Sequence, residues 1–197
     1  MELEKYIELA TRTESRLDEL IGNPQLIVNL LNIFISAGSM LDQMKKHVFY
    51  GKEYDINRFN GHFQSIINTM QHLTIIRING TKEEMGEESI SEIDPRIFHA
   101  VVGIATEAAE MCDALYKALT NQGIDLVNMR EENGDLNWYQ AIFYDAMKEL
   151  GYEGTWDDDL EKNIAKLKAR YPDKFDSDKA INRDLEKERK ILEDKDE

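Results

Sequence analysis

The pattern of apolar and polar positions predicts a chain made almost entirely of helices. Periodic stretches rich in Leu, Glu, Lys, Ala and Met are interrupted by only three prolines in 197 residues. Two prolines follow Asn23 and Asp94, an order typical of an N-cap residue and the first helical position. The third, Pro172, follows a periodic segment. We expect helices at about 2–21, 24–48, 57–78, 94–120, 127–150, 156–170 and 178–193.

The two halves of the chain resemble each other, and the stretch 79–91, which has two glycines and little apolar content, predicts an exposed connection between them. A shift of 71 residues aligns identical residues at seven positions between 26 and 80. Seven identities are only about twice the number expected from composition alone. The helix–loop–helix outline of the two halves, however, also matches. The shift favours a duplication, with pseudo-repeats at 24–80 and 94–151, although any two long amphipathic hairpins share much of this outline. The identical pairs are Ile33/Ile104, Ala37/Ala108, Met40/Met111, Asp42/Asp113, Lys46/Lys117, Asn57/Asn128 and Gly80/Gly151.

Composition narrows the class of protein. The chain has 39 acidic against 24 basic residues and is 42% hydrophobic, which favours a folded domain and disfavours nucleic-acid or anionic-lipid partners. Cys112 is the single cysteine, so neither an internal disulfide nor a thiolate metal site can form. The charged start is unlike a secretion signal, and no stretch of eighteen uncharged apolar residues stands out. We expect a cytoplasmic protein with no nucleic-acid partner and no membrane contact.

Four acidic residues form the main chemical signal. Glu107 and Glu110 share one helix face, and Glu132 and Asp135 share another. A turn near 121–125 would bring these faces together. The second pair falls in an arc that should be buried, where a carboxylate needs a cation or a proton. Four oxygen donors without Cys or His suit Mg²⁺ or Mn²⁺. The arc also contains Tyr139, Ile142, Phe143, Ala146 and Leu150.

Other readings of these residues stay open. In a chain this acidic, acidic pairs more often belong to solvated helix faces than to metal sites. Glu110 also lies far around the helix axis from the main apolar stripe of its helix. Gly134, beside the second pair, suggests close approach of a neighbouring helix or a ligand. Asn163, Lys166 and Arg170 fall on one narrow face. They could contact phosphate or be paired with neighbouring acids.

The runs HAVVGIATEAAEMCDAL, EENGDLNWYQAI and NIAKLKARYPDKFDSDKAINRDLEKER resemble the MazG-type all-α nucleoside triphosphate pyrophosphohydrolases, over about residues 97–190. Thr106 replaces the first Glu of the family's EExxE motif. The resemblance implies a Mg²⁺-dependent hydrolase that converts (d)NTP and water to (d)NMP and pyrophosphate. It implies that Glu107, Glu110, Glu132 and Asp135 bind the metal. It implies that Asn163, Lys166 and Arg170 face the triphosphate.

The first half is similar in outline to a MazG hairpin that has lost its acids. Under the shift of 71, neutral residues take the positions of the four acids: Ser36, Ser39, Gly61 and Gln64. Family members with one hairpin pair it with a second subunit. The resemblance therefore implies an all-α four-helix-bundle core from two fused helical hairpins, one catalytic and one silent. We expect one domain over 1–197, with 152–197 as a C-terminal helical segment, and a homodimer remains an option.

Two points of function remain open at the level of sequence. The base and sugar are not specified, and aromatic residues of the silent half could form a base pocket or belong to the core: Phe34, His47, Phe49 and Tyr50. The alternative function is a catalytically silent helical interaction or regulatory protein whose acids are solvated. A di-iron bundle is disfavoured because it requires Glu-x-x-His on two helices, and no histidine here follows a Glu by three residues.

Overall fold

The computed structural model describes residues 1–73 and 86–193. Within these residues the chain forms eight α-helices, one short 3₁₀ turn and one pair of two-residue strands, which confirms the all-α class. The chain divides into two compact units, Met1–Leu20 with Ser91–Leu160 (unit 1) and Ile21–Ile90 with Glu161–Glu197 (unit 2). The helices are α1 (Leu3–Ala10), α2 (Pro24–Tyr50), α3 (Ile56–Leu73), α4 (Pro95–Leu119), α5 (Leu126–Glu149), α6 (Trp156–Arg170), α7 (Ser177–Ile181) and α8 (Leu185–Leu192).

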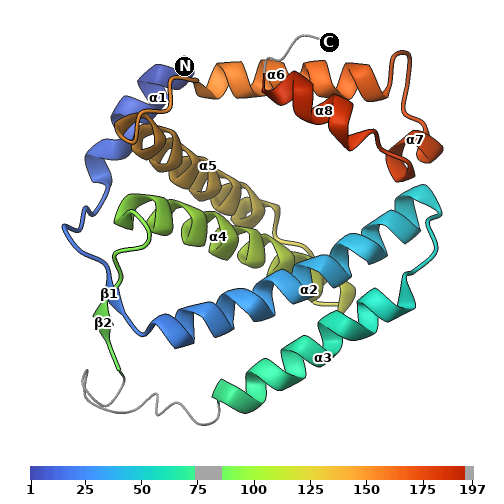
Figure 1. Ribbon diagram of the computed structural model, residues 1–197, viewed down its shortest axis with the longest axis horizontal. Helices are drawn as coiled ribbons and strands as arrows, with labels where there is room; N and C mark the ends of the chain where they lie inside the picture. The colour runs from blue at the N-terminus through green and yellow to red at the C-terminus, as the bar shows by residue number, and fades with distance from the viewer. Residues whose placement is uncertain (74–85, 194–197) are drawn as a thin grey trace. The chain divides into compact units, whose positions relative to one another are not determined.

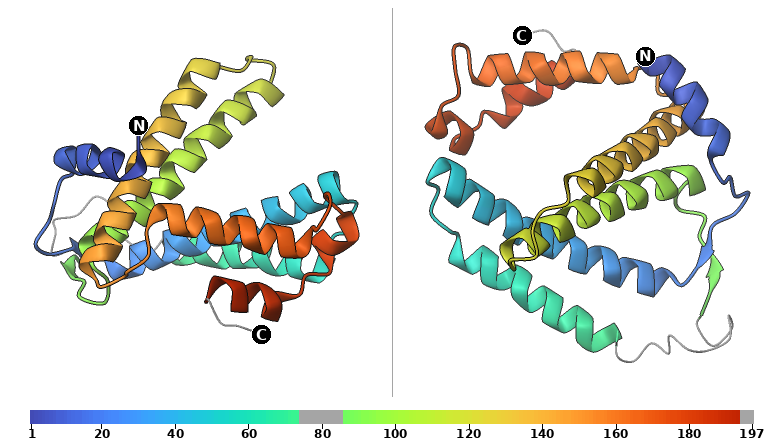
Figure 2. Two further views of the ribbon diagram at one scale, coloured as in Figure 1. Left: turned by 90° about the horizontal axis from the view of Figure 1, so that it is seen from above. Right: turned by 180° about the vertical axis from the view of Figure 1, so that it is seen from behind.

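Unit 1 is built on the antiparallel hairpin of α4 and α5, which lie side by side in Figures 1 and 2. Both helices start where the sequence predicts, because the Asp94 and Asp125 side chains accept hydrogen bonds from first-turn amides. Small side chains fill much of the buried contact, and the helix α1 packs on α5. The buried apolar residues of the hairpin are Ala100, Ala114, Ala141, Ile142 and Ala146.

The predicted N-terminal helix at 2–21 was too long. α1 ends at Ala10 and is followed by the 3₁₀ turn η1 (Thr11–Thr13). Glu14 then adopts an extended backbone, and its carboxylate forms a bidentate ion pair with the buried Arg96 guanidinium, with N–O distances of 2.8 and 2.6 Å. This pair joins residues 82 positions apart, so helical periodicity along the N-terminal segment could not reveal it.

Unit 2 contains the hairpin of α2 and α3, which also lie side by side (Figures 1 and 2). Gly51, in the left-handed region at φ 68°, ends α2. The strands β1 (Ile21–Gly22) and β2 (Glu88–Ser89) pair antiparallel. Where one helix was predicted over 178–193, the structure has α7 and α8, because the Asp184 side chain caps a new helix at Lys187 N. The predictions for 74–78 and for most of 79–91 lie outside the described residues.

The two hairpins share local features under the shift of 71 residues. Asn23–Pro24 starts α2 and Asp94–Pro95 starts α4, with the cap oxygens accepting from Leu26 N at 2.7 Å and Ile97 N at 3.0 Å. An Asp–Lys ion pair recurs one turn apart, at 2.5 Å for Asp42–Lys46 and 2.6 Å for Asp113–Lys117. The duplication itself stays a prediction. The predicted repeats fall in different units, and the segment 152–197 is divided between both.

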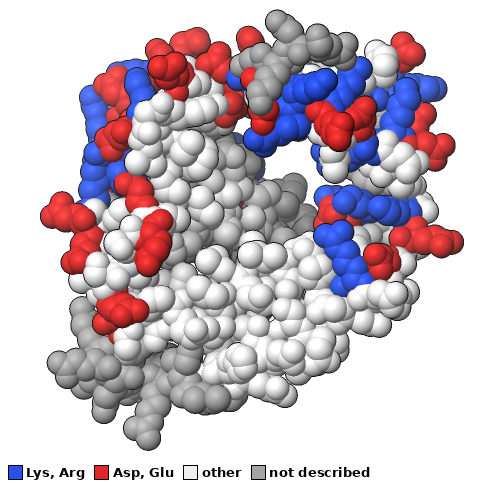
Figure 3. All heavy atoms as spheres, in the orientation of Figure 1, with Lys and Arg blue, Asp and Glu red and all other residues white. Residues whose placement is uncertain are grey.

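The helix α2 has an unusual composition. Within the described residues it is the one helix long and apolar enough to cross a membrane by length and composition, with a mean hydropathy of 1.4 over an 18-residue window. The sequence-based statement that no such stretch stands out was therefore wrong. A core helix of a folded protein passes the same test, so α2 is not assigned to a membrane. In Figure 3, charges gather at the end where α2 meets α3, and the rest of the visible face of this hairpin is uncharged.

Candidate functional site

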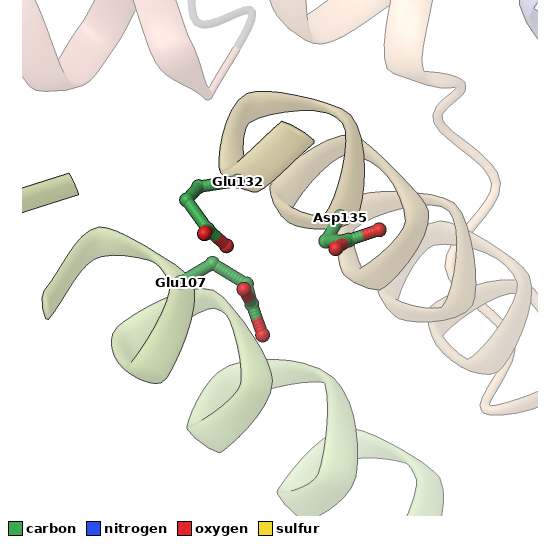
Figure 4. A group of neighbouring side chains, drawn as sticks. All are labelled: Glu107, Glu132 and Asp135. Atoms are coloured by element: carbon green, nitrogen blue, oxygen red, sulfur yellow. The ribbon is translucent and has the colours of Figure 1, made fainter. Parts of the chain in front are cut away.

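Three of the four predicted acidic ligands converge on the α4–α5 hairpin. One carboxylate oxygen from each of Glu107, Glu132 and Asp135 lies within 4.8 Å of the other two. Figure 4 shows Glu107 on α4 facing Glu132 and Asp135 on α5. Glu132 is buried, at 6% exposed, Glu107 is half-buried and Asp135 is exposed. We call these three residues the carboxylate cluster. In the part of the chain that the structure describes, it is the one such group of acidic, His or Cys side chains.

Glu110 lies outside the carboxylate cluster. Its side chain is exposed, and its oxygens are not among those within the 4.8 Å group. Three residues along α4 turn it about 60° round the helix axis from Glu107, toward solvent. Its charge still acts on the cluster, because it contributes to the raised pKa of Glu107. Glu110 is thus a neighbour of the three converging acids and not a fourth member.

The electrostatics of the cluster favour a cation. Burial, followed by the charge of Glu110 and a hydrogen bond with Glu132, raises the pKa of Glu107 above its ordinary value. Glu132 also accepts a hydrogen bond from the Asn128 amide. Among the described residues, no lysine or arginine is hydrogen-bonded to these three carboxylates. They therefore repel one another, and their hard oxygen donors match the preference of Mg²⁺. The donor set of the described residues therefore fits a divalent cation.

Two tyrosines near the cluster were missed by the sequence analysis as site residues. Burial, then the charges of Glu107 and Asp135, raises the pKa of Tyr139 on α5. Burial, then the charge of Asp135, raises the pKa of Tyr6 on α1. Tyr139 was predicted only as part of the apolar arc. No local signal could have indicated Tyr6, because α1 lies outside the acidic motif and reaches the cluster through its tertiary contact with α5.

An apolar cavity of about 290 Å³ adjoins the cluster through Tyr139, within unit 1. The Tyr139 ring also packs edge-to-face against His99, with ring centroids 5.4 Å apart. One wall of this cavity is formed by the N-terminal segment after η1, and the other wall is formed by the first half of α4. Its further lining residues are Ser15, Leu17, Leu20, Pro95, Arg96, Phe98, Val102, Gly103 and Thr106.

The predicted buried arc on α5 is correct only in part. Glu132, Ile142 and Ala146 are buried, but Asp135 and Leu150 are exposed. The expectation of a neighbouring helix at Gly134 was also wrong, because nothing in the described chain lies within 4 Å of the position a Cβ would take there; the alternative of a ligand beside Gly134 stays a prediction. The glycine that allows close packing is Gly103 on α4, which faces the Tyr139 ring.

The predicted phosphate-contacting residues belong to unit 2, whereas the carboxylate cluster belongs to unit 1. Asn163 is exposed and Lys166 is half-buried. Arg170 forms a bidentate ion pair with the buried Glu188, at 2.7 and 2.6 Å, and Arg183 contacts the same carboxylate. Of the two alternatives left open by the sequence, phosphate contact or pairing with a neighbouring acid, the structure shows the second for Arg170.

The predicted silent hairpin has no acids at the four shifted positions. Ser36 is buried, and Gln64 donates to Asn68 at 2.9 Å. The four aromatic candidates do not gather into one pocket. His47 stacks on Tyr54 and Tyr50 packs against Phe175, with ring centroids 4.6 and 5.3 Å apart. The other two, Phe34 and Phe49, are 47% and 71% exposed.

Comparison of this chain with protein-family models, with curated proteins and with solved structures gives no match. The geometry of the carboxylate cluster and the resemblance of its motif are therefore the observations that bear on function.

Proposed function

We propose that this protein is a Mg²⁺-dependent nucleoside triphosphate pyrophosphohydrolase of the MazG type. The observation that supports the proposal most is the approach of Glu107, Glu132 and Asp135 within 4.8 Å, from two helices of one hairpin. The spacing of these acids matches the family's motif, and their mutual repulsion gives a divalent cation a favourable site. The proposed reaction is (d)NTP + H₂O → (d)NMP + PPi, with Mn²⁺ as an alternative metal.

In this proposal, Glu132 and Asp135 bind the metal from α5 and Glu107 binds it from α4. Glu110 completes the acidic site from its exposed position. A divalent cation held there would neutralise the phosphates and lower the pKa of the water that attacks the α-phosphate. The chain's own contribution is to hold three carboxylates in position through the packing of α4 on α5. Asn163 and Lys166 are proposed to contact the triphosphate, with Lys166 stabilising the departing pyrophosphate. Arg170 is not included, because its guanidinium is paired with Glu188.

The apolar cavity beside Tyr139 is the proposed place for the nucleobase. It shares the Tyr139 side chain with the surroundings of the cluster, and its volume of about 290 Å³ accommodates a flat ring. The aromatic groups of Tyr139, His99 and Phe98 line it, and such rings stack on bases. The four aromatic residues named from the silent half do not form a shared pocket, which favours the cavity in unit 1.

We further propose that the α2–α3 hairpin serves as the silent half of a four-helix bundle with α4 and α5. Support comes from an apolar groove of about 650 Å³ on this hairpin and from the absence of charged residues in 24–41 and 59–73. Such a surface requires an apolar partner in water. The groove is lined by Ala37, Met40, Leu41, Met44, Tyr54, Ile56, Phe59, Phe63 and Ile66.

The same groove supports a second candidate function, a catalytically silent helical interaction protein. In that case the groove would bind a partner's amphipathic helix, and the acids of the cluster would be unrelated to catalysis. The two functions predict different outcomes in a nucleotide assay, so one experiment separates them.

The test is incubation of the full chain with Mg²⁺ and a panel of NTPs and dNTPs, including dUTP and dCTP. Pyrophosphate is measured through phosphate release by added pyrophosphatase. We expect turnover of at least one nucleotide, loss of activity in Glu132→Gln, and normal activity in the control Glu131→Gln, which neutralises an adjacent exposed acid. Absence of pyrophosphate with every nucleotide and metal, or near-parental activity of Glu132→Gln, would contradict the proposal.

A further inference from the structure

A second cavity in unit 1 lies away from the carboxylate cluster. It has a volume of about 790 Å³ and is lined by α1, the C-terminal end of α5, the loop 151–155 and the first turn of α6. Volumes of this size are typical of small-molecule sites. Tyr144, one of its lining residues, follows Asp135 by nine positions on α5, or about 13 Å along the helix axis. No member of the carboxylate cluster lines this cavity.

One wall of the cavity is aromatic. The rings of Tyr144 and Trp156 stack, with centroids 5.2 Å apart and an interplanar angle of 14°, and Tyr152 lies beside them in the lining. The hydroxyls of both tyrosines donate to the Asp159 carboxylate, at 3.0 and 2.8 Å. Because the polar ends of these rings are already bonded, their positions are set before any ligand arrives.

The loop in this wall is shaped around the Tyr152 ring. A Cβ at residue 154 would lie 2.5 Å from a ring atom of Tyr152, so only Gly154 allows the ring to lie against the loop backbone. The start of α6 is fixed by reciprocal hydrogen bonds, because Thr155 N and Oγ1 both donate to Asp158 at 2.7 Å and Asp158 N donates to Thr155. The aromatic wall is therefore part of an ordered structure.

The charge around the cavity is mostly negative. Five carboxylates and one ammonium group, that of Lys148, are found in the lining. Two carboxylates are already paired, Glu8 with Lys5 and Arg12, and Asp145 with Arg16 and Arg96. Among the described residues, no ion pair involves the other three. These are Glu4 on α1, Glu153 in the loop and Asp157 on α6.

Aromatic faces and unpaired carboxylates attract the same kind of ligand, an organic cation. A phosphate or another anion would be repelled by the acids, so this cavity is unsuited to a nucleotide. The three unpaired carboxylates come from three different elements, so a ligand with a single charge would leave others unmatched. An aliphatic polyamine, with several ammonium groups along an apolar chain, matches both the spaced acids and the aromatic wall.

We propose that this cavity of unit 1 binds an aliphatic polyamine, with methylene and ammonium groups against Tyr144 and Trp156 and further ammonium groups at Glu4, Glu153 and Asp157. This inference goes beyond the proposed pyrophosphohydrolase function and does not depend on it, since it uses neither the carboxylate cluster nor a metal.

The test is a calorimetric titration of the full chain with spermidine, without nucleotide or Mg²⁺, at about 150 mM NaCl to screen non-specific attraction to an acidic protein. We expect saturable binding at one site per chain. The double variant Glu153→Gln/Asp157→Asn should bind about tenfold more weakly. The control Asp18→Asn/Glu19→Gln removes the same charge from exposed residues that do not line the cavity, and it should bind like the parent.

The variant Trp156→Leu tests the aromatic wall separately, since it leaves every charge in place. We expect it to weaken spermidine binding severalfold, with helicity checked by circular dichroism. Equal weakening in both double variants would mean that spermidine responds only to net charge, which would overturn the proposal. Absence of saturable binding to the parent would overturn it as well. Because no nucleotide is present, either result leaves the proposed catalytic function to its own test.

Discussion

Gly103 lies directly against the ring of Tyr139. A Cβ at position 103 would be 2.1 Å from the nearest ring atom. This contact between α4 and α5 therefore has no room for any side chain larger than the hydrogen of glycine. The same ring lines the apolar cavity beside the carboxylate cluster. The packing of α4 on α5 and the shape of the candidate site therefore depend on one pair of residues.

Replacing Gly103 by alanine should destabilise the protein by about 1–3 kcal/mol, because the Tyr139 ring cannot stay in place without overpacking. The matched control is Gly134→Ala on α5, where a Cβ would meet nothing within 4 Å. That variant should be more stable than the parent by about 0.5–1 kcal/mol, because alanine loses less backbone entropy in a helix. Urea unfolding followed by circular dichroism measures both, and equal stabilities would contradict the packing argument.

The raised pKa of Glu107 predicts a pH dependence of stability for the metal-free protein. A carboxyl whose pKa is higher in the folded state binds its proton more tightly there. Its contribution is fully favourable below the ordinary value of 4.5 and is lost as the pH rises through the raised pKa. Glu107→Gln should thus have nearly the parent's melting temperature at pH 4 and a higher one at pH 7. A variant less stable than the parent at pH 7, with chelator present, would be inconsistent with crowded like charges.

Metal binding should stabilise the folded chain through a single cluster. Because unfolded chains do not hold three carboxylates together, Mg²⁺ at about 100 times its Kd should add about 2.7 kcal/mol of stability. Calorimetry should find sites belonging to one cluster per chain, lost in Glu132→Gln. Glu110→Gln should retain more of the stabilisation than Glu107→Gln does, because Glu110 lies outside the converging group. Equal losses in these two variants would restore Glu110 as a full ligand.

Glu188 should be important for the stability of the C-terminal segment. Hydrogen bonds from Arg183 and then Arg170 lower its pKa to about 2. Its contribution is therefore present above the ordinary value of 4.5 and is lost as the pH falls through about 2. Glu188→Gln should cost about 2 kcal/mol at pH 7, and its difference from the parent should shrink as the pH falls from about 4.5 toward 2. The exposed Glu186→Gln on the same helix is the control and should differ little from the parent at any pH.

The starts of α2 and α4 were determined by the sequence alone, whereas the separate start of α8 was not predicted. Asn23–Pro24 and Asp94–Pro95 place a hydrogen-bond acceptor and a fixed φ at adjacent positions, and both interactions lie within one turn. The apolar arc of α5 predicted the burial of Glu132 correctly but that of Asp135 wrongly, because burial also depends on which elements pack over that face. Cap interactions within one helical turn form independently of the rest of the fold, so the order of residues along the chain predicts them.

The tertiary structure decided the features that depend on distant residues. Glu14 lies in extended backbone after η1, and its carboxylate binds Arg96, 82 positions away. Glu188 on α8 forms an ion pair with Arg170 on α6. Tyr6 comes near Asp135 through the packing of α1 on α5. The energy of each contact exists only once the chain has brought both partners together. A periodic pattern gives the face on which a side chain lies, and only the packed structure determines what that face meets.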